Sequence, residues 1–265
     1  MRIRASRSAC FPGDAIRFTT DGVVDDEVRW SGGGSPPSGD GVAFRSTFVE
    51  GGRYLVRAEA RGAVAQVEIA VCPMDAWLAD AQLFFGPSLD VNDVTVVSSP
   101  FVFGASTRAW TCNNVVRCKR AREADRLPSQ ATLIHELGHV LQHRSGQAQL
   151  LAGFVEQIRR LFGRDPYDFG GPNGVRGATT LQRFSKEAQA QIITELWKAD
   201  HGAPADRLGV RFSEPGYVDD LRRLAEGAGL GISDAHRRTF VGVLDSAVAA
   251  VVNAVLKPFD QTMNA

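Results

Sequence analysis

The residues best suited to chemistry form one short motif, His135-Glu136-Leu137-Gly138-His139, of the pattern HExxH. Side chains four positions apart on an α-helix share one face and lie about 6 Å apart along the axis. His135 and His139 can therefore bind one metal ion. Glu136 beside them can take a proton from a metal-bound water molecule and pass it to a leaving amine. The motif predicts the chemistry of a zinc-dependent peptidase.

The motif lies within the strongest helical pattern of the chain, which predicts a helix over residues 130–143. We expect Leu133, Leu137 and Leu141 to anchor this helix on the face away from the metal. Gly138 has no side chain and is expected to leave the helix surface uncrowded beside the site. The alternative is a chance motif on a solvated helix. The stretch is mostly apolar, however, and burying two imidazoles and a carboxylate there without partners would be costly. A bound metal ion removes that cost.

A catalytic zinc ion needs a third protein ligand. His143 continues the four-residue spacing, but it lies about 12 Å along the helix from His135 and cannot reach the same ion. Gln142 and Ser145 stand where the metzincin pattern HExxHxxGxxH requires glycine and histidine. The sequence therefore excludes that class of peptidase.

Carboxylates further along the chain are the remaining candidates for the third ligand. A helix expected over residues 181–199 carries Glu187 and Glu195 on its polar side, and we favour Glu187. Glu195 would then either orient a ligand histidine or be an ordinary solvated carboxylate. Asp165 and Asp168, in the loop before this helix, are alternative ligands.

Transition-state stabilisation needs a hydrogen-bond donor close to the developing oxyanion. Tyr167, His201 and Tyr217 are candidates by residue type, and packing or surface roles are the alternative for each. Tyr167 ranks first because its loop precedes the helix of the third ligand. Metal binding requires neutral imidazoles, so activity is expected to fall in acid.

The segments TLIHELGHVLQ and FSKEAQAQIITELW, with Tyr167 and Phe169 in the loop between them, resemble a family of bacterial HExxH zinc metallopeptidase domains. These gluzincin-like zincin domains occur in toxin and effector proteins and beside contractile injection systems. The resemblance covers residues 90–197, including pre-helix strands around Asp93-Val94 and residues 108–116.

This resemblance implies a zincin fold and makes Glu187 the position that matches the family's downstream glutamate. With His135 and His139 it would complete a zinc site, and Glu136 would be the general base. Leu196-Trp197 stands where the family has aromatic residues, which is a mild departure.

Residues 1–74 contain short alternating apolar runs separated by glycine-rich turns, a pattern that predicts a small β-sandwich. The order of PGD at 12–14, VRW at 28–30 and GGRYLV at 51–56 resembles PKD-like and other Ig-like domains. Trp30 and Tyr54 would then be core residues. Such a domain would dock a protein partner.

The predicted fold class is therefore multi-domain. An all-β Ig-like sandwich over residues 1–74 precedes an α+β, mainly helical zincin-like domain over residues 75–265. Two β-like runs are expected at 94–103 and 109–117, after a short helix or linker at 75–81. The expected helices cover residues 130–143, 148–162, 181–199, 218–226 and 234–256.

Composition and charge restrict the partners. Lys plus Arg and Asp plus Glu are both 30, which provides no basic field for nucleic acid. The apolar segment 240–256 is shorter than the ~20 residues of a spanning helix, so no stable membrane insertion is expected. No apolar run follows the basic start, which argues against a signal peptide. Localisation stays open, with export by a specialised secretion system as one route.

Four cysteines permit two local disulfides, Cys10 with Cys72 and Cys112 with Cys118, which would suit an oxidising compartment. Four buried thiols are the equally weighted alternative.

The sequence as a whole predicts a zinc-dependent endopeptidase that acts on protein or peptide substrates. The competing prediction is a catalytically inactive zincin-like module whose Ig-like domain docks a partner.

Overall fold

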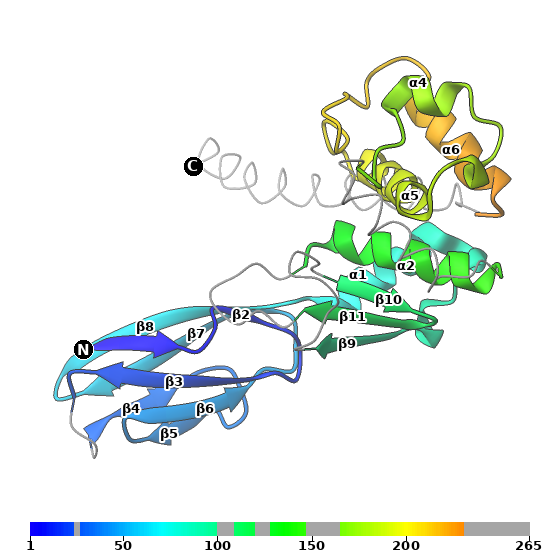
Figure 1. Cartoon of the computed structure of the whole chain (residues 1–265). Coiled ribbons are helices and arrows are strands. Elements are labelled where there is room, and N and C mark those ends of the chain that lie inside the picture. The colour runs from blue at the N-terminus through cyan, green and yellow to red at the C-terminus, as the bar shows by residue number, and fades with distance from the viewer. Residues whose placement is uncertain (24–26, 100–108, 120–127, 147–164, 231–265) are drawn as a thin grey trace, which may run out of the picture.

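The computed structural model describes residues 1–23, 27–99, 109–119, 128–146 and 165–230. These residues form three β-sheets and five α-helices (Figure 1). The first two sheets are built from the N-terminal strands. The third sheet and all five helices follow Cys72 in the chain.

The two N-terminal sheets have strand orders β1-β3-β6 and β2-β8-β7-β4-β5. Their strands are Arg2–Ala5 (β1), Ala9–Cys10 (β2), Ala15–Asp21 (β3), Arg29–Ser31 (β4), Ser38–Asp40 (β5), Ala43–Thr47 (β6), Gly52–Ala60 (β7) and Ala63–Val71 (β8). β2 pairs with β8 in parallel, and the other neighbours are antiparallel. The β7–β8 hairpin turns at Arg61 and Gly62, with φ of 48° and 76°. Two positive φ angles give the backbone twist that tight hairpins favour.

Aromatic side chains fill the space between these two sheets. The rings of Phe18, Trp30 and Phe44 have centroids 5.7 to 6.1 Å apart. The indole N–H of Trp30 donates to the carbonyl of Gly41 at 2.6 Å, so its polar atom is paired inside the core. Truncating a buried phenylalanine such as Phe18 to alanine costs about 3–5 kcal/mol. This cluster is separate from the one to which the helices contribute.

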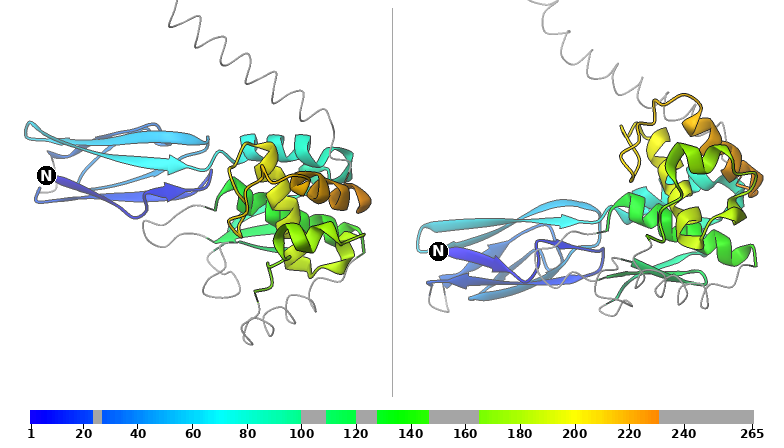
Figure 2. Two further views of the ribbon diagram at one scale, coloured as in Figure 1. Left: turned by 90° about the horizontal axis from the view of Figure 1, so that it is seen from above. Right: turned by 45° about the horizontal axis from the view of Figure 1, so that its top comes forward.

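The remaining elements share a second cluster of buried residues. They are Met74–Phe85 (α1), Gly86–Ser88 (η2), Val91–Asp93 (η3), Thr95–Ser99 (β9), Ala109–Cys112 (β10), Val115–Lys119 (β11), Gln130–Arg144 (α2), Gly171–Arg176 (α4), Leu181–Arg183 (η4), Lys186–Asp200 (α5) and Tyr217–Gly227 (α6). The sheet has the order β10-β11-β9, with β10 antiparallel and β9 parallel to β11. Helix α2 lies between this sheet and α5, as Figures 1 and 2 show.

The predicted fold class, with a mainly helical second part, is wrong. The described residues contain eleven strands in three sheets against five mostly short helices. The strand content after Cys72 was underestimated because the single run expected at 109–117 is a hairpin of β10 and β11. Asn113, with φ of 56°, makes the turn. Asparagine tolerates this left-handed conformation better than most residues.

Other expected elements lie wholly or partly outside the described residues. This applies to the helices at 148–162 and 234–256 and to the end of the run at 94–103. Among the described helices, none combines the length and the apolar character needed to span a membrane. The short helix expected at 75–81 is longer, because α1 continues to Phe85.

All four cysteines are free thiols, so of the two equally weighted alternatives the structure has the thiols and not the disulfides. Cys112 is opposite Val115 and Cys118 is opposite Ala109 in the hairpin. Side chains alternate between the faces of a sheet, so the two cysteines point to opposite faces and cannot pair. Burial raises the pKa of Cys72 and Cys118 to about 12. These thiols therefore stay protonated and unreactive near neutral pH.

Candidate metal centre

Helix α2 carries the HExxH motif, and its sequence fixes where it begins. The side chain of Ser129 accepts a hydrogen bond from the backbone N–H of Thr132 at 3.2 Å, which caps the first turn. Leu133 and Leu137 are buried in the core, so the helix cannot rotate about its axis without exposing them. This anchoring directs His135 and His139 toward α5.

Helix α5 carries the third candidate ligand in its first turn. It begins at Lys186, whereas the expected helix began at residue 181, because residues 181–183 form a separate 3-10 turn. The hydroxyl of Ser185 accepts from the N–H of Ala188 at 3.1 Å and donates to the carbonyl of Pro166 at 2.7 Å. The cap thereby ties the start of α5 to the preceding loop. The partial positive charge of a helix N-terminus also favours a carboxylate at Glu187.

The two helices approach closely beside the motif. A Cβ atom at Gly138 would lie 3.4 Å from both Cα and Cβ of Ala190. Two small residues therefore face one another where α2 and α5 pack. This close packing agrees with the expectation that Gly138, which has no side chain, leaves the helix surface uncrowded. The close approach brings Glu187 within reach of both histidines.

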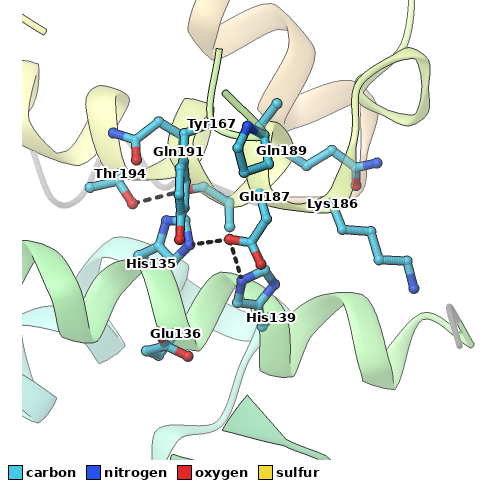
Figure 3. A network of polar contacts seen from close by, with 12 residues as sticks. His135, Glu136, His139, Tyr167, Lys186, Glu187, Gln189, Gln191 and Thr194 are labelled. Atoms are coloured by element: carbon cyan, nitrogen blue, oxygen red, sulfur yellow. Dashed lines mark hydrogen bonds and ion pairs between the residues drawn. The ribbon is translucent and has the colours of Figure 1, made fainter. Parts of the chain in front are cut away.

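His135, His139 and Glu187 form a group that could hold a metal ion, with ligand atoms within 4.8 Å of one another. Oε2 of Glu187 lies 3.0 Å from Nε2 of His135 and 3.3 Å from Nε2 of His139 (Figure 3). Two ligands of one tetrahedral zinc ion are roughly 3.4 Å apart, given metal–ligand distances of about 2.1 Å. The two distances from Glu187 are therefore compatible with ligands of one metal ion.

The electrostatics of this group also favour a cation. Burial alone would lower the pKa of His139, but the charge and hydrogen bond of Glu187 raise it to about 9. Burial alone would raise the pKa of Glu187, but the charge of His139 and the hydrogen bonds from both imidazoles hold it well below its usual range. Without a metal ion the carboxylate therefore keeps a proton on a neighbouring imidazole. A divalent cation would take the place of that proton.

Gln142 orients one of the ligand histidines. Its Oε1 lies 2.9 Å from Nδ1 of His139. Its Nε2 donates to the carbonyl of Lys186 at 2.9 Å and to Oε1 of Gln189 at 3.3 Å. These two donated bonds turn the oxygen of the Gln142 amide toward His139. Nδ1 of His139 must then carry a hydrogen, which leaves Nε2 as the atom for the metal.

Glu136 lies on the side of α2 that faces the third sheet (Figure 3). It is buried, and its Oε2 accepts a hydrogen bond from the hydroxyl of Thr111 on β10 at 2.6 Å. It is not one of the three ligands. Its negative charge nevertheless contributes to the raised pKa of His139, which places the carboxylate within electrostatic reach of the ligand group.

Tyr167 is the predicted oxyanion donor, and the structure brings it to the ligand group. Its ring centroid lies 5.5 Å from that of His135, and Figure 3 shows the two side chains adjacent. His201 and Tyr217 do not join them. His201 pairs with Asp80, and Tyr217 is buried with its hydroxyl on Asp206. Of the three candidates by residue type, only Tyr167 is beside the candidate metal centre.

The alternative ligands are also placed elsewhere. Asp165 binds Arg207, and Asp168 accepts from the backbone N–H of Gly170 at 2.8 Å. Glu195 is fully buried and bonded to Gln191 and Lys198, so it neither faces solvent nor orients a ligand histidine. Within the described part of the chain, no group that could hold a metal ion contains any of these three carboxylates or His143.

Three contacts at the site were not found from the sequence. They involve Gln142, Thr111 and Arg207, whose guanidinium lies over the ring of Tyr167. For Gln142 the signal was available, since it lies three residues after His139 on the same helix. Thr111 and Arg207 are brought in by tertiary packing and carry no signal in the local sequence.

No protein-family description matches this sequence, and no curated protein matches it significantly. We therefore infer the function from the geometry of the site.

Proposed function

We propose that this protein is a zinc-dependent peptidase that hydrolyses peptide bonds in protein or peptide substrates. The observation that carries the proposal is the convergence of His135, His139 and Glu187 from two packed helices. Two imidazoles and one carboxylate are a ligand set that catalytic zinc sites use, with a fourth position left for water or substrate. The HExxH motif on α2 supplies the adjacent acid–base group that hydrolysis needs.

Zinc is the ion that this donor set favours, because imidazole nitrogen and carboxylate oxygen in a three-ligand arrangement suit it better than magnesium or calcium. When bound, zinc would polarise the scissile carbonyl and lower the pKa of a water molecule at the open position. Gln142 would keep His139 in the tautomer that offers Nε2. Glu187 would supply the negative charge that stabilises the cation.

In this proposal Glu136 takes the proton from the attacking water and delivers it to the leaving amine. The Thr111 hydroxyl fixes the orientation of the Glu136 carboxylate, since it donates to Oε2. Tyr167 offers a phenol beside His135, where it would donate to the oxyanion of the tetrahedral intermediate. The proposed base, Glu136, and the proposed oxyanion donor, Tyr167, would thus act from different sides of the ligand group.

A second candidate function is a metal site without catalysis. It is favoured by the placement of Glu136, whose carboxylate is engaged by Thr111 on the sheet side of α2. In that case the metal would only hold α2 and α5 together, and the protein would act by binding a partner.

Peptide cleavage by the zinc-loaded protein separates the two functions. Casein and a peptide library are incubated with the parent protein and with a Glu136→Gln variant, and products are identified by mass spectrometry. We expect the variant to retain zinc but to cleave at least ~10²-fold more slowly, because it lacks the general base. Equal cleavage by both proteins would refute the proposed mechanism. Zinc binding without any cleavage by the parent would support the non-catalytic site.

A further inference from the structure

Arg207 lies on a loop that follows α5. Its guanidinium carbon is 4.6 Å from the centroid of the Tyr167 ring, a cation–π distance. The ring of Tyr167 in turn lies 5.5 Å from that of His135. Tyr167 is therefore in contact with Arg207 as well as with a candidate metal ligand.

A second contact joins Arg207 to the same loop segment. Its Nη1 lies 3.1 Å from Oδ2 of Asp165, and Oδ1 of Asp165 accepts from the backbone N–H of Tyr167 at 3.1 Å. The planar guanidinium thus meets both the Tyr167 ring and the carboxylate that fixes the Tyr167 backbone. A lysine ammonium cannot reproduce both contacts, because it lacks the flat face and the forked donors.

The backbone around Arg207 is itself held in place. Asp206 is buried, and its Oδ1 accepts from the N–H groups of Leu208 and Val210, both at 2.8 Å. The Tyr217 hydroxyl binds the other carboxylate oxygen of Asp206. Ala205 and Arg211 close the loop through an isolated β-bridge. A rigid turn therefore presents Arg207 to Tyr167.

The Tyr167 segment is also fastened to the helix of Glu187. The carbonyl of Pro166 accepts from the hydroxyl of Ser185, the residue that caps α5. Asp165, Pro166 and Tyr167 are thus held from two sides. The ring of Tyr167 extends from this held segment, and the Arg207 guanidinium covers it.

We propose that Arg207 is a positioning residue that holds the Tyr167 side chain beside His135 at the candidate metal centre. The catalytic consequence rests on the proposed peptidase function, in which Tyr167 is the oxyanion donor. The structural consequence does not, since it concerns only where the Tyr167 ring lies. Two separate measurements can therefore test the two parts.

Fluorine NMR of protein labelled with 3-fluorotyrosine tests the position of the ring in metal-free protein. The chain has three tyrosines, and Tyr167→Phe assigns the resonance of interest. We expect Arg207→Ala to move the Tyr167 resonance and to leave those of Tyr54 and Tyr217 in place. Because Arg207 and Asp165 form a half-exposed ion pair, the substitution should leave the fold intact.

The matched control is Arg211→Ala, which removes an exposed guanidinium from the same loop. It should leave all three resonances unchanged, and Arg207→Lys should restore the Tyr167 resonance only in part. With cobalt(II) in the metal site, the paramagnetic shift of the Tyr167 resonance should be smaller in Arg207→Ala than in the parent. An unchanged Tyr167 resonance in Arg207→Ala would overturn the proposal.

Kinetics of peptide cleavage test the catalytic part. Loss of a positioning residue should lower kcat roughly tenfold with KM little changed, because substrate contacts are kept while the donor is displaced. A raised KM with unchanged kcat would instead make Arg207 a substrate-binding residue and would overturn the positioning role. A parent protein that cleaves nothing would contradict the proposed function, while the fluorine measurement would still decide the position of Tyr167.

Discussion

Oxygen Oε2 of Glu187 connects the two helices of the candidate metal centre, because it lies within 3.3 Å of an imidazole nitrogen on each of His135 and His139. The histidine pair could be predicted from sequence, since their four-residue spacing within one helix fixes their relation. The spacing of the residues alone does not show whether Glu187 or Glu195 is the third ligand. The structure separates them by burial, because Glu195 lies inside the core with Lys198 as its partner.

Gln142 is expected to contribute to zinc affinity through its contact with His139. Replacing it in Gln142→Leu removes the amide oxygen next to Nδ1 of His139, so the imidazole loses the contact that fixes its orientation. We expect zinc affinity to fall by about tenfold, the lower range for loss of such an orienting group. Competition with a chromophoric chelator at neutral pH measures the affinity.

The matched control for this measurement is Gln182→Leu, which makes the same replacement at an exposed position in η4, just before α5. Its zinc affinity should equal that of the parent. If Gln142→Leu also binds zinc as tightly as the parent, the orienting role of Gln142 is wrong.

Among the elements, α1, α2 and α5 meet at a polar network centred on Asp80. Its carboxylate accepts from Nε2 of Gln130 at 2.8 Å, from the indole N–H of Trp197 at 2.9 Å and from Nε2 of His201 at 3.0 Å. Nδ1 of His201 faces the carbonyl of Trp197 at 2.8 Å. Both ring nitrogens of His201 thus face acceptors, an arrangement that only the protonated imidazole satisfies fully.

This network predicts a pH dependence of stability. Burial alone would lower the pKa of His201, but the hydrogen bonds to Asp80 and to the Trp197 carbonyl, with the charges of Asp80 and Asp200, raise it. A raised pKa in the folded state adds stability that is fully present below the unfolded value of about 6.5 and is lost as pH rises through the folded value. We expect His201→Gln to lower the free energy of unfolding by about 1–2 kcal/mol at pH 5.5.

Urea denaturation of the parent and of His201→Gln between pH 5.5 and 9 checks this dependence, with His143→Gln at the end of α2 as the matched histidine control. The difference between parent and His201→Gln should shrink toward the alkaline end. A difference that stays constant or grows with pH would contradict the assignment of a raised pKa to His201.

The elements themselves could be predicted only in part. The apolar spacing of Leu133 and Leu137 is a local feature, so the helix around them was evident from the sequence. The third sheet was underestimated because β10 and β11 are short, and their pairing depends on the turn at Asn113. Burial of Thr111 against α2 is a tertiary contact between distant segments, which no local pattern reports.

For the whole molecule, the described residues form two separate hydrophobic clusters, one between the N-terminal sheets and one around α2 and α5. The candidate metal centre lies between α2 and α5, within the second cluster. A docking role for the N-terminal sheets stays a prediction. The expectation of no nucleic-acid partner, which rests on the balance of 30 basic and 30 acidic residues, also stays a prediction.

The mass of the intact protein under native conditions tests whether His135, His139 and Glu187 bind a metal ion. Parent, Glu187→Ala and Glu195→Ala are purified without a metal-affinity tag, supplied with zinc at neutral pH and passed through a desalting column. We predict one zinc ion per chain in the parent and in folded Glu195→Ala, and none in Glu187→Ala. A parent without zinc, or a Glu187→Ala variant that keeps one, would contradict the assignment of His135, His139 and Glu187 as the metal site.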